Sequence, residues 1–261
     1  RDAGWPALVE RIVRGGFPEA LARTDGARRA AWFGSYIATI LERDVRDLSN
    51  VQNLSDLPRL LRLLAARTSG VLNLSGVARD AHRPLTTLQR HWALLEAVFF
   101  VRTLPAWSGN LTSRLAKAPK VLLNDTGLLC HLLNLDADRL KTDELMSGSV
   151  LESFVAGELA KQAAWSRTRP ALFHYRTQKQ QEVDLVMEDG AGRLVGIEVK
   201  KTASPTSGDF KGLRHLAEQT GKRFLRGLLL YTGSTSVGFE ADLHAVPVSA
   251  LWQLEAELAG P

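Results

Sequence analysis

The segment Glu182–Lys200, EVDLVMEDGAGRLVGIEVK, holds the pattern that decides the fold of the C-terminal half of the chain. Apolar and polar residues alternate on both sides of the turn-forming sequence DGAG (189–192). Alternation with a period of two predicts two half-buried strands, which the turn joins as a hairpin. With the hairpin centred near Ala191, Asp184 lies opposite Glu198 on one face. Like charges opposed at about 4.5–5.5 Å between Cβ atoms destabilise a sheet, so this pair is expected to bind a cation.

The elements around this hairpin follow from the same patterns. Before the hairpin, a helix is expected at 149–165 and a strand at 171–177. After it, we expect a helix at 209–221, a nearly all-apolar buried strand at 224–231, a short strand at 243–248 and a final helix at 249–259. The predicted order of this domain is therefore α-β-β-β-α-β.

The sequence of the N-terminal half predicts mainly helices. Residues 1–54 are expected to form helices, with a break at Gly15-Gly16 and a restart at Pro18. Residues 55–104 are predicted to form a helix, a short helix that Ser75 caps, a basic helix and the start of a hairpin, which is the order of a winged helix-turn-helix. The predicted domains are 1–54, a helical segment; 55–134, the winged-helix part; 135–148, a polar linker; and 149–261, the sheet domain.

The basic helix of this part is the predicted DNA-contacting element. One face is expected to be buried and the other to reach phosphates and base edges. The expected buried residues are Leu85, Leu88, Trp92 and Leu95, and the expected DNA-contacting residues are Arg83, Thr86, Thr87 and Arg90. The alternative is a winged-helix module that packs against a protein partner.

Charge and composition narrow the class of protein. The net charge is +5, and residues 56–120 hold ten basic against three acidic side chains. This excess favours a polyanionic partner, with a solvated arginine-rich surface as the alternative. A single cysteine, Cys130, excludes an internal disulfide, and no membrane span or signal peptide is visible, so a cytoplasmic location is expected. The chain begins at Arg1 rather than methionine, which suggests a piece of a longer protein.

The chemistry of the hairpin can be read from its side chains. Asp184 and Glu198 offer the hard oxygen donors that Mg²⁺ and Mn²⁺ prefer. Lys200 points to the same side and is placed to orient a water or stabilise charge on a phosphate. The alternative is an ion pair between Glu198 and Lys200 on an exposed sheet face. The six histidines show no metal-binding spacing, and no P-loop motif occurs.

The element order, with Asp184 and the Glu198-x-Lys200 motif on the second and third strands, resembles the PD-(D/E)XK nuclease fold. The likeness is to the RecB-like and archaeal Holliday-junction-resolvase branches, with Val183 where the motif conventionally has proline. The resemblance implies a restriction-endonuclease-like fold and a glutamate on the preceding helix, in a G-x-x-x-E stretch that Gly148 and Glu152 supply. It also implies the carbonyl of Val199 as a metal ligand. Arg176 is a candidate phosphate contact.

The helical wheel leaves the helical glutamate open. Glu158 lies nearer than Glu152 to the apolar stripe of Leu151, Phe154 and Val155. The predicted catalytic residues are Glu152, Asp184, Glu198 and Lys200, and the predicted ligands of Mg or Mn are Asp184, Glu198, Val199 and Glu152, with Glu158 as second choice.

Motifs spread along the chain resemble one further family. They include RGGFPEAL, SYIATILERDVRDL, SGVLNLSGVAR, GSVLESFVAGEL, HYRTQKQQEVDLV and GIEVKKTAS. They look like the C-terminal region, called domain of unknown function 4143, of bacterial and archaeal AAA-type ATPases. The resemblance implies an upstream ATPase module that binds ATP in the full-length protein. Two functions follow as hypotheses: a metal-dependent DNA endonuclease, or a non-cleaving DNA- or protein-binding module that regulates the ATPase.

Overall fold

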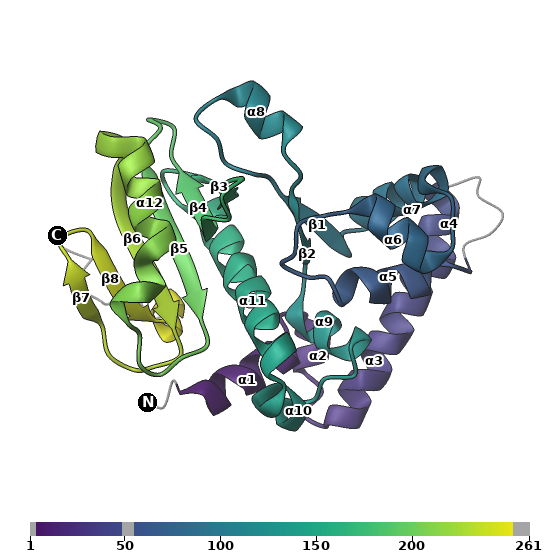
Figure 1. The fold of residues 1–261 in the computed structure, drawn as a ribbon. Helices are drawn as coiled ribbons and strands as arrows, with labels where there is room; N and C mark the ends of the chain where they lie inside the picture. Colours follow the sequence, from purple (N-terminus) through teal and green to yellow (C-terminus); the bar gives the residue numbers. More distant parts are fainter. Residues whose placement is uncertain (1–3, 49–54, 253–261) are drawn as a thin grey trace. The chain divides into compact units, whose positions relative to one another are not determined.

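A computed structural model describes residues 4–48 and 55–252 of the chain, an α/β protein (Figure 1). The chain divides into two compact units. The helical unit comprises Val9–Leu104 and Lys117–Phe154, and the sheet unit comprises Arg1–Leu8, Pro105–Ala116 and Val155–Pro261. Among the described residues, none of the helices combines the length and apolar character that a membrane crossing needs.

The sheet unit is built on one mixed six-stranded sheet in the order β3-β4-β5-β6-β8-β7. The β3–β4–β5 part is antiparallel, β5, β6 and β8 run parallel, and β7 is antiparallel to β8. The strands are β3 (Ala171–Arg176), β4 (Glu182–Glu188), β5 (Leu194–Lys200), β6 (Phe224–Tyr231), β7 (Val237–Glu240) and β8 (Leu243–Pro247). The predicted order α-β-β-β-α-β is confirmed; β7 was not predicted.

Two helices frame this order. Helix α11 (Glu144–Trp165) precedes β3, and α12 (Lys211–Thr220) connects the parallel strands β5 and β6 after a 3₁₀ turn, η2 (Ser207–Phe210). Figure 1 shows α12 lying along the strands that it connects. A further 3₁₀ turn, η4 (Val248–Trp252), follows β8, and the rest of the predicted final helix lies outside the described residues.

The register of the central hairpin agrees with the prediction. Leu185 pairs with Ile197 and Glu188 with Leu194, so the hairpin is centred at Ala191. The ladder ends one residue short of Asp184 and Glu198, and β4 carries an irregularity between Val183 and Val186, so the predicted pairing of Asp184 with Glu198 stays a prediction. Gly196 lies under Leu213 and Leu216 of α12, so the alternation of side chains along β5 puts Glu198 on the α12 side of the sheet.

The core of the sheet unit includes a residue from far upstream, Trp107. The segment Pro105–Ala116 extends the edge of β3: the Trp107 N–H donates to the carbonyl of His174 at 2.6 Å, and the His174 N–H donates to the carbonyl of Pro105 at 2.9 Å. Helix α8 (Leu111–Ala116) follows. The outer edge of β3 is thereby paired near its middle.

Residues 5–48 are helical as predicted, with the expected break. Gly15 has a φ of +69°, a conformation that glycine adopts without the cost that a side chain adds. Pro18 then begins the next helix. The elements are α1 (Trp5–Arg14), α2 (Pro18–Leu21), α3 (Gly26–Thr39), a π-helical turn η1 (Ile40–Asp44) and α4 (Val45–Leu48).

Three helices follow in the predicted order, α5 (Leu57–Ala65), α6 (Leu74–Ala81) and α7 (Leu85–Ala97), and then an antiparallel pair of strands, β1 (Val101–Leu104) and β2 (Lys120–Leu123). The pair is not the predicted hairpin, because residues 105–119, which include a helix, lie between its strands. Two local predictions are wrong. The side chain of Asn73, not Ser75, caps α6 by accepting from the Gly76 N–H at 2.8 Å. Leu85 is 38% exposed, because α7 begins there, whereas Leu88, Trp92 and Leu95 are buried as expected.

The segment 135–148, predicted as a linker, is largely helical. It follows α9 (Thr126–Leu132) and forms α10 (Ala137–Thr142) and the first turn of α11. Two of its three aspartates act as helix caps: Asp136 accepts from the Arg139 N–H at 2.8 Å and Asp143 from the Met146 N–H at 2.9 Å. A carboxylate at this position satisfies a free N–H of the first turn.

Candidate functional site

Asp184 is the anchor of the candidate site in the sheet unit. Its side chain is withdrawn from solvent, and Oδ2 accepts a hydrogen bond of 2.9 Å from the backbone N–H of Val199. The bond crosses from β4 to β5 beyond the last ladder pair, Leu185 with Ile197. It fixes the carboxylate next to the backbone of the second strand, beside the carbonyl that the sequence suggested as a ligand.

Glu198 and Lys200 on β5 form an ion pair near Asp184. Nζ of Lys200 lies 2.9 Å from Oε1 of Glu198, whose side chain is 11% exposed. Burial alone would lower the pKa of Lys200, but the nearby carboxylates outweigh it and raise that pKa, Glu198 first and then Asp184 and Asp209. The lysine is therefore held protonated. The ion pair that the alternative predicted exists, with a buried Glu198 and a Lys200 side chain that is 41% exposed.

Asp209 is a neighbour that the sequence reading missed. It sits in η2 after β5, where Oδ2 accepts from the Thr206 N–H at 2.7 Å and from the Thr206 hydroxyl at 2.8 Å. The spacing Thr-x-x-Asp is a capping box, and it was visible in the sequence. Its carboxylate adds to the negative potential at Lys200.

The donor set suits a divalent cation held by few protein ligands. Asp184 and Glu198 supply hard oxygens, and the carbonyl of Val199 is adjacent. Among residues 4–48 and 55–252, no group of three or more His, Cys, Asp or Glu side chains gathers as a metal site. Mg²⁺ commonly binds through one or two carboxylates and keeps several waters, so this smaller set still fits it.

The helical glutamates have other partners. Glu152 belongs to the helical unit, where Nζ of Lys120 lies 2.6 Å from its Oε1, with both side chains largely buried. Glu158 belongs to the sheet unit and forms an ion pair with Lys161, one turn further along α11. The contribution of either to a metal site stays a prediction.

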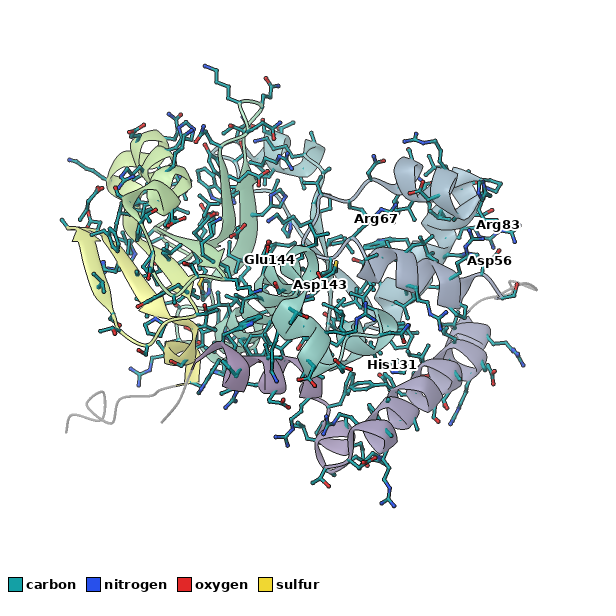
Figure 2. All side chains as sticks on the ribbon, turned by 60° about the horizontal axis from the view of Figure 1, so that its bottom comes forward. Asp56, Arg67, Arg83, His131, Asp143 and Glu144 are labelled. Atoms are coloured by element: carbon teal, nitrogen blue, oxygen red, sulfur yellow. The ribbon has the colours of Figure 1, made fainter. Side chains whose placement is uncertain are left out.

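Of the predicted nucleic-acid contacts, Arg83 and Arg176 form ion pairs within the protein, and the others lie on α7. Nε of Arg83 lies 2.7 Å from Oδ2 of Asp56, and Figure 2 shows the two side by side. Arg83 precedes Pro84 and the start of α7, so its predicted place on the helix face is wrong. Arg176 pairs with Glu182 at 2.7 Å. Thr86 and Arg90 are exposed on α7, and Thr87 is half-buried.

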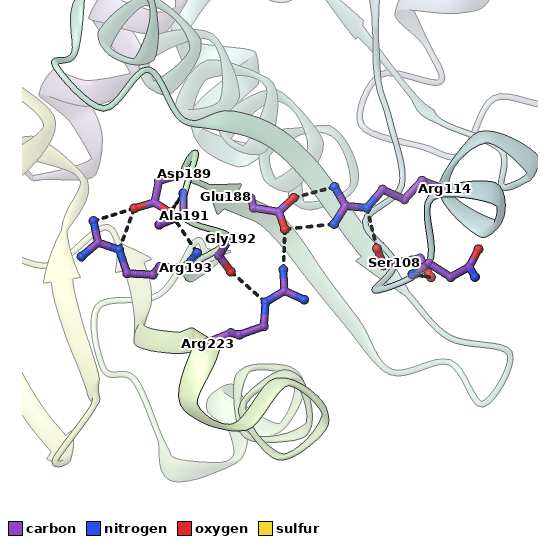
Figure 3. Close-up of polar contacts among 9 residues, drawn as sticks. Ser108, Arg114, Glu188, Asp189, Ala191, Gly192, Arg193 and Arg223 are labelled. Atoms are coloured by element: carbon purple, nitrogen blue, oxygen red, sulfur yellow. Dashed lines mark hydrogen bonds and ion pairs between the residues drawn. The ribbon is translucent and has the colours of Figure 1, made fainter.

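A second polar cluster, also missed, surrounds Glu188 at the far end of β4 (Figure 3). Arg114 donates to both its carboxylate oxygens, at 2.5 and 3.0 Å, and Arg223 donates to Oε1 at 2.6 Å. The hydrogen bond from Arg114 is the main cause that lowers the pKa of Glu188. Both guanidinium groups also lie over the ring of Trp107, at 5.4 and 5.7 Å from its centroid. This cluster fastens α8 to the sheet.

Taken together, the features define an α/β protein with a buried acidic pair and a lysine at one end of its sheet. The chain belongs to the family described as a domain of unknown function, DUF8612, which matches residues 6–139. A second domain of unknown function, DUF4143, matches residues 147–251. The resemblance to DUF4143 is thus confirmed, but over this range rather than nearly the whole chain.

Two mycobacterial proteins are similar to the chain. They are the uncharacterized proteins Rv2008c of Mycobacterium tuberculosis (strain ATCC 25618 / H37Rv) and Mb2031c of Mycobacterium bovis (strain ATCC BAA-935 / AF2122/97). Each is 33% identical over 207 residues, which cover 79% of this chain and 46% of the relative. The chain therefore spans about half the length of the curated relatives it matches. No solved structure is significantly similar to it.

Proposed function

We propose that the sheet unit is a metal-dependent nuclease module that cleaves phosphodiester bonds in DNA. The observation that carries the proposal is the clustering of Asp184, Glu198 and Lys200 where β4 begins and β5 ends, with both carboxylates buried. Two carboxylates beside a protonated lysine suit a divalent cation and a phosphate. We further propose that the whole protein couples this module to an ATPase in the cytoplasm.

In this proposal each residue has a separate role. Asp184, Glu198 and the carbonyl of Val199 hold Mg²⁺ or Mn²⁺. When bound, such an ion lowers the pKa of a water and holds a phosphate oxygen. Lys200 stays charged beside the carboxylates and stabilises negative charge that builds on the phosphate. The hydrogen bond from the Val199 N–H keeps Asp184 in a fixed orientation.

Two structural features support the fold-level part of the proposal. The order α11-β3-β4-β5-α12-β6, with the acidic pair on β4 and β5, is the one expected of a restriction-endonuclease-like domain. The order α5-α6-α7-β1-β2 is the one expected of a winged helix, in which α7 would face DNA. Arg90 and Thr86, exposed on α7, are then the first candidates for backbone contacts.

The test combines cleavage and metal binding. The purified chain is incubated with Mn²⁺ or Mg²⁺ and linear, nicked or branched DNA, and Mn²⁺ affinity is measured by calorimetry. Asp184→Asn should abolish cleavage and weaken Mn²⁺ binding at least tenfold, because it removes a charged ligand. Asp189→Asn is the matched control: Asp189 lies in the β4–β5 turn and pairs with Arg193, so both activities should stay. Cleavage that survives Asp184→Asn, or no cleavage by a folded chain, would contradict the proposal.

Glu152→Gln and Glu158→Gln extend the test to the helical glutamates. The variant that lowers cleavage while thermal stability is unchanged identifies the one that contributes. If neither does, the pair on β4 and β5 is sufficient.

A second function is a non-cleaving module that binds DNA or a protein and regulates an ATPase. The observation that favours it is that Lys200 and Lys120 neutralise Glu198 and Glu152. In this case Mn²⁺ should not bind at millimolar concentration, while DNA binding persists. Arg90→Ala should then flatten the slope of log K against log[salt] by about 0.9 for one lost phosphate contact. Arg83→Ala should change it less, because Asp56 already neutralises Arg83.

A further inference from the structure

A cavity of about 600 Å³ lies within the helical unit, away from every residue assigned above. Its walls come from α3, η1, α4, α5 and α9. The apolar lining includes Ile37, Leu41, Pro58 and Leu132. Sites for small organic molecules typically measure about 300–1,000 Å³ and are lined mainly by apolar side chains with a few polar groups. The cavity has that size and that character.

The wall on one side is an irregular helix. Residues Ile40–Asp44 form a π-helical turn between α3 and α4, and two of them, Leu41 and Glu42, line the cavity. Single π-turns within helices are rare and are found frequently at functional sites. This observation is independent of the volume of the cavity.

Positively charged side chains outnumber negatively charged ones at the cavity. Arg46 and Arg62 line it together with one acid, Glu42, which leaves one positive charge in excess. Within the part of the chain that the structure describes, neither arginine has an ion-pair or side-chain hydrogen-bond partner. His131, seen in Figure 2, also lines the cavity. Burial and the nearby charge of Arg62 lower the pKa of His131, so it is neutral and can accept or donate a hydrogen bond.

We propose that this cavity binds a small organic monoanion, a carboxylate attached to an apolar body. The apolar walls take the body, and Arg62 and Arg46 take the carboxylate, with His131 as a further hydrogen-bonding group. The excess of one positive charge matches a single negative charge on the ligand, and Glu42 disfavours a dianion. The inference does not rest on the proposed nuclease function, because all lining residues belong to the helical unit.

The experiment uses matched pairs of probes with the whole chain. Decanoate, 2-naphthoate and indole-3-acetate are each compared with the uncharged primary amide of the same body, by calorimetry and by the NMR signal of the His131 ring. At least one acid should bind tenfold or more tightly than its amide and shift the His131 signal. Arg62→Met should abolish this preference, because methionine keeps an unbranched apolar stem but removes the charged guanidinium.

Two substitutions separate binding in the cavity from binding elsewhere. Ala38→Trp fills the cavity from α3 and should abolish binding, whereas Ala31→Trp, exposed on the same helix but not at the cavity, should leave it unchanged. Arg43→Met, on η1 but outside the lining, is the control for Arg62→Met. Thermal unfolding verifies that every variant is folded. Three outcomes would each overturn the proposal: no acid binds below about 1 mM, acids and amides bind equally, or binding survives Ala38→Trp.

Discussion

Nζ of Lys120 lies 2.6 Å from Oε1 of Glu152, and the two side chains are only 8% and 15% exposed. Removing one member of a buried pair leaves the other charge without compensation, which costs about 3–5 kcal/mol. Lys120→Met should therefore lower the free energy of unfolding strongly. The double variant Lys120→Met/Glu152→Leu should recover most of the loss, because two apolar groups need no partner. Urea unfolding followed by circular dichroism measures both.

The matched control for this pair lies on the same helix. Lys161→Met removes an exposed partner of Glu158, and exposed pairs contribute about 0–1 kcal/mol. Equal losses in Lys120→Met and Lys161→Met would show that the buried pair is not an essential contact.

Glu188 should make the stability of the sheet unit depend on pH. Its pKa is lowered from the ordinary value of 4.5, chiefly by the hydrogen bond from Arg114. A lowered pKa gives a contribution that is present above 4.5 and is lost as the pH falls through the folded-state value. Glu188→Gln should cost about 1–3 kcal/mol at pH 7, from the loss of charged hydrogen bonds. The difference from the wild type should shrink as the pH falls below 4.5.

Urea unfolding at pH 7, 5, 4 and 3 follows this difference. Glu240→Gln, which removes an exposed partner of Arg214, should change stability little at every pH. A difference between Glu188→Gln and wild type that is constant from pH 7 to pH 3 would contradict the assignment.

Gly212 permits the close approach of α12 to β4. A Cβ at this position would lie 1.8 Å from the carbonyl oxygen of Glu182, a backbone atom that no side-chain rotation can move. Gly212→Ala should therefore destabilise by about 3 kcal/mol, the upper end for overpacking. It should also disturb Asp184, two residues from Glu182. Gly157 on α11 has no atom within 4 Å of the same position, so Gly157→Ala should stabilise by about 0.5–1 kcal/mol. Thermal unfolding should show opposite signs.

Phe99 lies two residues after the end of α7, in a backbone conformation that suits glycine. Its φ is +58° and its side chain is 77% exposed, so the strain is not offset by burial. The N–H of Phe100 donates to the carbonyl of Leu95 at 3.0 Å, which closes the helix end. Phe99→Gly should stabilise by about 1 kcal/mol, and Phe99→Ala should gain much less because it keeps a Cβ in this region. Equal midpoints in urea for both variants would show that the backbone is not strained there.

The site on β4 and β5 was largely predictable, because it depends on local pattern. Alternation predicts the two strands, and the four turn residues predict the register that pairs Leu185 with Ile197. The irregularity of β4 beside Asp184 has no signal in the sequence. Arg83 was also predictable in principle. It precedes Pro84, and a residue before proline is disfavoured in a helix. The helix therefore begins after both, and Arg83 is free to reach Asp56.

The ion pairs Lys120–Glu152 and Arg114–Glu188 join residues that are far apart in the sequence, and local sequence patterns do not predict such pairs. Lys120 and Glu152 are 32 residues apart, and nothing near Lys120 in the sequence indicates a buried lysine. Arg114 and Glu188 are 74 residues apart. Their pairing depends on the segment Pro105–Ala116 joining the sheet unit, which neither helical nor strand periodicity predicts.

The segment Pro105–Ala116 also limits where the gene could be divided between the two family domains. Residues 6–139 and 147–251 match separate families, yet the stretch Pro105–Ala116 from the first supplies Trp107 to the core of the sheet and pairs the edge of β3. A recombination event that joined residues 147–251 to another N-terminal half would leave an open strand edge and a gap in that core. Open edges promote aggregation. The boundary between the two families is therefore a poor point for gene fusion or fission, and we expect the two segments to occur together.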